Sequence, residues 1–72
     1  MFKAFQKMNR LGYEVLLADG KLRVSKASIM KVNNPMDETN ALEWTEMVVQ
    51  DNEPKATLVK TDDMYAYFGT AA

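Results

Sequence analysis

The sequence predicts a small α+β protein folded as a single domain over residues 1–72, and two patterns carry this prediction. Residues 1–11 have the apolar spacing of a helix, and further along Asp19-Gly20 separates two short apolar segments. A hydrophobic fraction of 47% with 26% charged residues is typical of folded chains rather than disordered ones. We therefore expect a helix followed by a β-hairpin. A domain of this length has a small core and is near the lower size limit for independent folding.

Residues 1–11 predict an amphipathic helix that packs on the hairpin. Its apolar half on a helical wheel consists of Met1, Phe2, Ala4, Phe5, Met8 and Leu11. Gly12 stands just past the last apolar position, where a residue in the left-handed conformation would end the helix. The outward half carries a basic ridge formed by Lys3, Lys7 and Arg10.

Residues 13–18 and 21–26 predict the two strands of the hairpin. Asp19-Gly20 between them suits a type I′ turn, which needs a positive φ at both central positions. The expected partners are Val15 with Val24 and Leu17 with Leu22 on one face, and Leu16 with Arg23 and Glu14 with Ser25 on the other. Residues 27–32 either extend the second strand past a bulge or form a third strand.

The middle of the chain allows two interpretations. Asn33-Asn34-Pro35 is expected to interrupt regular secondary structure. Beyond it, Asp37 could cap a helix running to Gln50. The apolar side of this helix would consist of Ala41, Leu42, Trp44, Met47, Val48 and Val49. The alternative is a second hairpin, with strands 44–50 and 55–60 about the loop 51–54. Helix formers in the first half favour the helix.

The last part of the chain predicts a strand over residues 55–60 and then a short helix. Thr61-Asp62-Asp63 is typical of a cap and acidic first turn, and the helix 64–68 would end at Gly69. Residues 70–72 would form a fraying tail. The expected order is therefore α-β-β-α-β-α.

The composition argues against catalysis. General acids, bases and nucleophiles are most often His or Cys, and the chain has neither, which also removes the favoured ligands of zinc. Residues 28–31 fit the S-x-x-K pattern of penicillin-binding enzymes, but the chain lacks the accompanying S-D-N and K-T-G motifs. The acidic pairs Asp37-Glu38 and Asp62-Asp63 are adjacent, which suits capping better than acid–base work. We expect no enzyme activity, no cofactor and no metal.

Charge is polarised along the chain, although the net charge is only −1. Residues 1–31 carry seven basic and two acidic side chains, a balance of +5, and residues 32–72 carry two basic and eight acidic, a balance of −6. The candidate partner-binding residues are the basic ones of the hairpin and its preceding helix: Lys3, Lys7, Arg10, Lys21, Arg23 and Lys26. A solvated face is the other interpretation, since the helix ridge and the outward hairpin side chains would point away from each other.

Two binding hypotheses follow. The first is a non-enzymatic protein–protein interaction module, a small regulator, inhibitor or assembly subunit such as a phage accessory protein, whose polarised charge steers a partner or a second copy. The second is a nucleic-acid-binding module that uses the basic half of the chain. Tyr65, Tyr67 and Phe68 could stack nucleobases, but Asp62 and Asp63 beside them would repel phosphate. Without a long apolar run or an uninterrupted apolar segment near residue 1, we expect a cytoplasmic protein that does not enter membranes.

Overall fold

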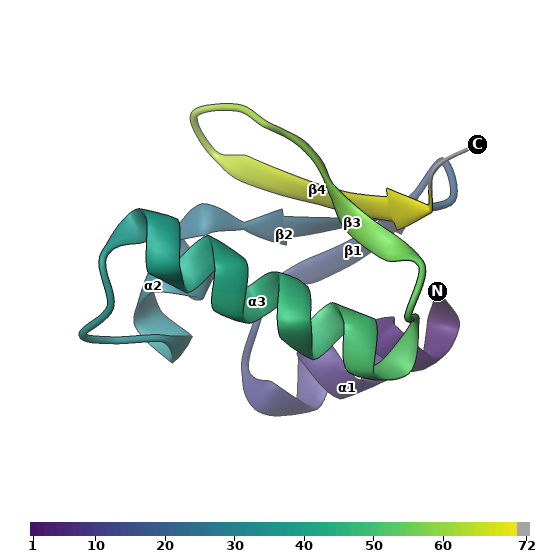
Figure 1. Ribbon diagram of the computed structural model, residues 1–72, viewed down its shortest axis with the longest axis horizontal. Helices are drawn as coiled ribbons and strands as arrows, with labels where there is room; N and C mark the ends of the chain where they lie inside the picture. The colour runs from purple at the N-terminus through teal and green to yellow at the C-terminus, as the bar shows by residue number, and fades with distance from the viewer. Residues whose placement is uncertain (71–72) are drawn as a thin grey trace.

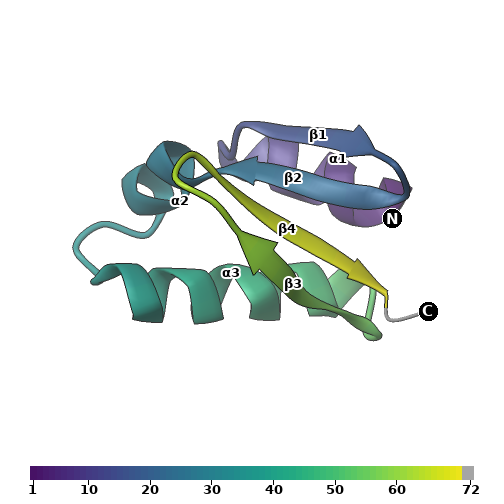
Figure 2. The same ribbon diagram turned by 90° about the horizontal axis from the view of Figure 1, so that it is seen from above.

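The computed structural model describes residues 1–70, which form an α+β domain with three helices and one four-stranded antiparallel sheet (Figure 1). In chain order its elements are α1 (Phe2–Leu11), β1 (Val15–Ala18), β2 (Lys21–Ser25), α2 (Lys26–Val32), α3 (Glu38–Asn52), β3 (Ala56–Thr61) and β4 (Tyr65–Thr70). The strand order is β1-β2-β4-β3. Figure 2 shows α1 and α3 on the same side of the sheet, which leaves the other side without a helix.

The fold consists of two helix-then-hairpin units. In the first, α1 precedes the β1–β2 hairpin, and in the second, α3 precedes the β3–β4 hairpin. The two hairpins join through antiparallel pairing of β2 with β4, so that β1 and β3 are the edges of the sheet. α2 connects the units at one end.

The core lies between the sheet and the two long helices. Its largest fully buried apolar side chains come from both units and from α2; they are Met8, Leu22, Val24, Ile29, Val49 and Phe68. Burying one side chain of this size contributes about 1.5–3 kcal/mol. A polar group joins them, since the amide nitrogen of Asn33 donates hydrogen bonds to the hydroxyls of Tyr13 and Thr45 at 3.2 and 3.1 Å.

The first half of the fold confirms the expected helix and hairpin. Gly12 ends α1 in the left-handed conformation with φ 103°. Asp19 and Gly20 have φ of 53° and 72°, and β1 and β2 pair Val15 with Val24 and Leu17 with Leu22. Asp37 caps α3 by accepting a hydrogen bond from the N–H of Asn40 at 2.8 Å, so the helical interpretation of the middle segment is confirmed.

The prediction for residues 27–32 is wrong, because they form the helix α2 rather than a strand. The hydroxyl of Ser25 accepts a hydrogen bond from the N–H of Ser28 at 3.2 Å and caps the helix. The hydroxyl of Ser28 in turn donates to the carbonyl of Ser25 at 2.8 Å and accepts from the N–H of Glu14 at 3.0 Å. These bonds turn the chain out of the sheet directly after β2.

The predicted helix 64–68 is also wrong, because β4 occupies this segment and pairs with both β2 and β3. One carboxylate oxygen of Asp62 accepts hydrogen bonds from the N–H groups of Met64 and Tyr65 at 2.9 and 2.7 Å. Asp62 therefore stabilises a hairpin turn instead of a helix start. Thr70 belongs to β4, and the rest of the predicted tail lies outside the described residues.

Helix α3 presents a narrower apolar side than the sequence suggested. Ala41, Thr45 and Val49 are its buried residues. Trp44 and Met47, which we placed on the buried side, are 48% and 56% exposed. No helix within residues 1–70 is long and apolar enough to cross a membrane.

Candidate functional site

The two edge strands of the sheet, β1 and β3, differ in the hydrogen bonding of their outward backbone groups. Along β3, the carboxylate of Glu46 accepts a hydrogen bond from the N–H of Leu58 at 2.6 Å. One turn later in α3, the amide nitrogen of Gln50 donates to the carbonyl of Ala56 at 2.9 Å. Alternate residues of an edge strand direct their backbone groups outward, and two side chains of α3 bond two of these groups on β3.

The outer edge of β1 has no such cover. The N–H of Ser25 donates to the carbonyl of Glu14 at 2.9 Å, so by alternation Leu16 and Ala18 also bond to β2. The backbone groups of Val15 and Leu17 therefore point away from the sheet. Within the described part of the chain, no group outside the β1–β2 pair hydrogen-bonds to β1.

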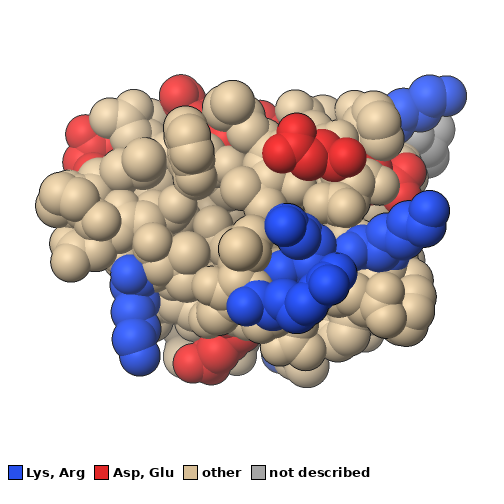
Figure 3. Space-filling model, turned by 90° about the horizontal axis from the view of Figure 1, so that it is seen from below, with Lys and Arg blue, Asp and Glu red and all other residues tan. Residues whose placement is uncertain are grey.

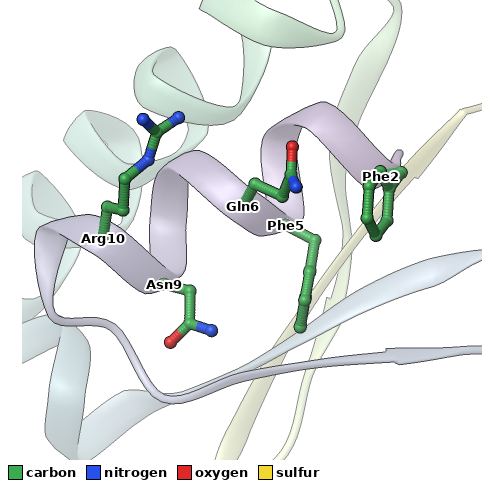
Figure 4. Close-up of a pocket in the computed structure, with 5 residues that line it drawn as sticks. All are labelled: Phe2, Phe5, Gln6, Asn9 and Arg10. Carbon is green, nitrogen blue, oxygen red and sulfur yellow. The ribbon is translucent and has the colours of Figure 1, made fainter.

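Exposed apolar side chains surround this open edge. Leu16 and Leu17 lie on opposite faces of β1 and are 53% and 43% exposed, and Phe2 in α1 is 61% exposed. The rings of Phe2 and Phe5 stack with centroids 6.3 Å apart. They line a surface hollow of α1 together with Gln6, Asn9 and Arg10 (Figure 4). In that view Phe5 and Asn9 extend from α1 toward the strands.

The six candidate basic residues do not gather on one surface. Lys3, Lys7 and Arg10 are exposed along α1 on the helical side of the molecule, where Lys and Arg side chains cluster in Figure 3. Lys21 and Arg23 lie on the opposite, helix-free face of the sheet. Lys26 begins α2, where its ammonium group donates to the carbonyl of Asp62 at 3.1 Å and lies 3.6 Å from the carboxylate of Glu38.

The helix-free face also holds residues that sequence reasoning did not assign to it. The guanidinium carbon of Arg23 lies 4.3 Å from the ring centroid of Tyr65, and the ammonium nitrogen of Lys60 lies 4.7 Å from that of Tyr67. Lys60 was overlooked because it belongs to the acidic half of the sequence. The alternation of Tyr65 and Tyr67 with buried Ala66 and Phe68 was the available signal for a strand.

A hydrogen bond fixes one of these tyrosines. The hydroxyl of Tyr67 donates to the carboxylate of Asp62 at 3.0 Å. This bond raises the pKa of the Tyr67 phenol, and the N–H groups of Tyr65 and Met64, with Tyr67, lower the pKa of Asp62. Within residues 1–70 no three acidic side chains lie close enough together to hold a metal ion.

Comparison of the chain with family models, curated proteins and solved structures finds no match. The two surfaces described above, the open edge of β1 and the helix-free face of the sheet, are therefore the basis for assigning a function.

Proposed function

We propose that this chain is a non-catalytic protein-interaction module that docks an extended segment of a partner along β1. The observation that carries the proposal is the difference between the two edges of the sheet. Side chains of α3 bond the outward carbonyl of Ala56 and N–H of Leu58 in β3, whereas within residues 1–70 the outward groups of β1 are left open. Open edges promote unwanted pairing, so a fold that covers one edge and leaves the other exposed favours a use for the second.

The contacts available at β1 suit a short extended peptide. The N–H and C=O groups of Val15 and Leu17 offer up to four backbone hydrogen bonds, each worth about 0.5–1.5 kcal/mol net. Leu16 and Leu17 flank the edge on its two faces, and the hollow beside Phe2 and Phe5 can receive an apolar side chain. Backbone bonds would supply affinity and the apolar positions specificity.

The basic ridge of α1, whose Arg10 also lines the hollow, favours an acidic partner. Arg10 lines the hollow, and Lys3 and Lys7 continue the basic ridge along α1. None of the three takes part in an ion pair within the described residues. A segment that combines apolar residues with Asp or Glu would be steered toward this edge and would approach faster at low salt.

A foreign partner fits better than a second copy of the chain. If β1 paired with β1 of another copy about a two-fold axis, the two α1 helices would lie side by side beneath the joined sheet. The hollows lined by Phe2, Phe5 and Arg10 would then meet, which would bring the two Arg10 side chains into one interface. The charge of Arg10 therefore opposes self-pairing through this edge.

A peptide-display selection against the purified chain tests the proposal. We expect the selected peptides to be apolar and acidic, and to slow hydrogen exchange at the N–H groups of Val15 and Leu17. The variant Leu17→Pro removes an outward N–H without removing a bond to β2, so it should weaken binding by at least about fivefold. The matched control Leu17→Thr loses the same leucine but keeps the N–H, and should bind more tightly than Leu17→Pro. Selected peptides that protect other amides, or that bind both variants equally, would contradict docking on β1.

A further inference from the structure

The helix-free face of the sheet presents an ordered row of side chains across all four strands. The register places Leu16 of β1, Arg23 of β2, Tyr67 of β4 and Lys60 of β3 side by side on this face. Tyr65 lies two residues before Tyr67 on the same strand and therefore on the same face. Two cations and two aromatic rings thus share an uncovered surface at the centre of the sheet.

A third cation joins this row through Gly69. The Cγ of Lys21 lies 3.0 Å from the position that a Cβ on residue 69 would take, so the absence of a side chain lets the lysine stem lie across β4. Lys21, Arg23 and Lys60 then surround one hollow with Tyr67, Ala18 and Asp19. Any side chain at position 69 would displace the Lys21 stem.

The hollow keeps a net positive charge, because Asp19 is the one carboxylate among its described lining residues beside three cations. The ion pairs of residues 1–70 involve neither Lys21 nor Arg23 nor Lys60. The Nε atom of Arg23 is buried and has no hydrogen-bond partner among the described residues. The three cations outnumber the carboxylate of the hollow and repel one another, so the arrangement favours an anionic ligand.

We infer that this face binds single-stranded nucleic acid, with phosphate oxygens in the hollow of Lys21, Arg23 and Lys60. Unpaired bases stack on aromatic rings and on the planes of arginine guanidinium groups, and Tyr65 carries Arg23 over its ring. In a duplex each base is already stacked on its neighbours, so the faces of its bases are not available for such stacking. The cations complement phosphate, and the tyrosines suit bases, which together indicate a polynucleotide strand rather than an acidic peptide.

The acidic turn beside the tyrosines limits where on this face phosphate can bind. Asp62 accepts hydrogen bonds from two backbone N–H groups and from the hydroxyl of Tyr67, so its carboxylate is surrounded by donors. Its carboxylate reaches as far as the hydroxyl of Tyr67, whereas Lys21 packs at Gly69, two residues further along β4. Phosphate would therefore bind toward Gly69 and bases toward Tyr65.

Fluorescence anisotropy with labelled oligothymidylate of about 12 nucleotides tests the inference on the full chain. Three phosphate contacts predict that log K falls with log salt concentration with a slope of about −2. The double variant Lys21→Gln with Lys60→Gln should reduce the slope by about 1.4 and weaken binding at low salt by about tenfold or more. Tyr65→Leu should weaken binding by about fivefold or more through lost stacking.

The matched control Lys3→Gln with Lys7→Gln removes the same charge from the helical side and should leave the affinity within about twofold of wild type. Absence of binding at low salt, or equal weakening by both pairs, would overturn the inference. Equal affinity for a DNA duplex or for a nucleoside triphosphate would overturn the assignment to single strands. Leu17→Pro should bind the oligonucleotide like wild type, so this inference and docking on β1 can fail separately.

Discussion

The carboxylate of Glu46 in α3 accepts a 2.6 Å hydrogen bond from the backbone N–H of Leu58 in β3. Gln50, one helical turn later, donates to the carbonyl of Ala56 in the same strand. α3 therefore covers the edge of its own hairpin with polar side chains, while α1 offers β1 no equivalent bond. Two units of the same order, helix then hairpin, thus differ at their free edges.

This difference yields a prediction for the covered edge. Replacing both residues, Glu46→Ala with Gln50→Ala, should leave an N–H and a carbonyl of β3 without their partners and lower the free energy of unfolding by about 1–3 kcal/mol. The opened edge should also promote self-association. Urea unfolding and analytical sedimentation measure the two effects. Glu43→Ala, an exposed change on the same helix, is the control. Unaltered stability and a monomer in the double variant would show that α3 does not protect β3.

The turn between β1 and β2 yields a second prediction. Gly20 has φ 72°, and a Cβ on it would meet no atom within 4 Å, so any cost of substitution comes from the backbone. Gly20→Val should therefore destabilise the fold by about 1–3 kcal/mol, whereas Gly20→Asn should be better tolerated because Asn adopts the left-handed conformation more readily. Thermal unfolding of the two variants checks this difference. Melting of the Val variant at the wild-type temperature would contradict the need for positive φ.

The sequence predicts those segments of the fold whose structure is set by neighbouring residues, such as turns and helix caps. The Asp19-Gly20 turn, Gly12 and the Asp37 cap each act on neighbouring residues, and each prediction from them is confirmed. The prediction of a helix after Asp62 is wrong because aspartate is common both at the start of helices and in hairpin turns. Pairing of β4 between β2 and β3 decided between these outcomes, and that pairing is not visible in a local pattern.

The candidate site shows the same limit. The basic ridge of α1 follows from helical spacing, and the structure keeps Lys3, Lys7 and Arg10 exposed on that helix. The grouping of Lys21 and Arg23 with Lys60 depends on register across three strands, which joins residues far apart in sequence. A division of the chain into basic and acidic halves separates these residues, although the fold brings them together.

The contact between Asp62 and Tyr67 yields a third prediction, on pH dependence. The pKa of Asp62 is lowered in the folded chain, so the stability that its carboxylate contributes is present above the unfolded pKa of about 4 and is lost as the pH falls through the folded value. The pKa of Tyr67 is raised, so its contribution is present below about pH 10 and is lost as the pH rises through the folded value. Asp62→Asn should lower the pKa of Tyr67 toward its usual value, as measured by NMR titration of the ring signals. An unshifted Tyr67 in this variant would contradict the cause assigned here.

The fourth prediction concerns the basic ridge and separates a docking surface from a solvated one. Lys3, Lys7 and Arg10 are exposed and form no ion pair within residues 1–70, so reversing their charge breaks no bond of the fold. Isolated exposed pairs contribute only about 0–1 kcal/mol, and we expect the triple change to Glu to leave the melting temperature nearly unaltered.

Docking should respond differently to the same triple change. An acidic peptide selected on the wild-type chain would be repelled by the negatively charged ridge of the variant. Its association rate at low salt should therefore be much lower than with the wild type, and lowering the salt should no longer increase it. Stopped-flow measurement across a salt series separates this electrostatic effect from a loss of contacts, which would raise the dissociation rate instead. The triple change to Gln, which removes the charge without reversing it, should give an intermediate association rate. Equal association rates in all three chains would mean that the ridge does not steer the partner, and the acidic character proposed for that partner would then be wrong.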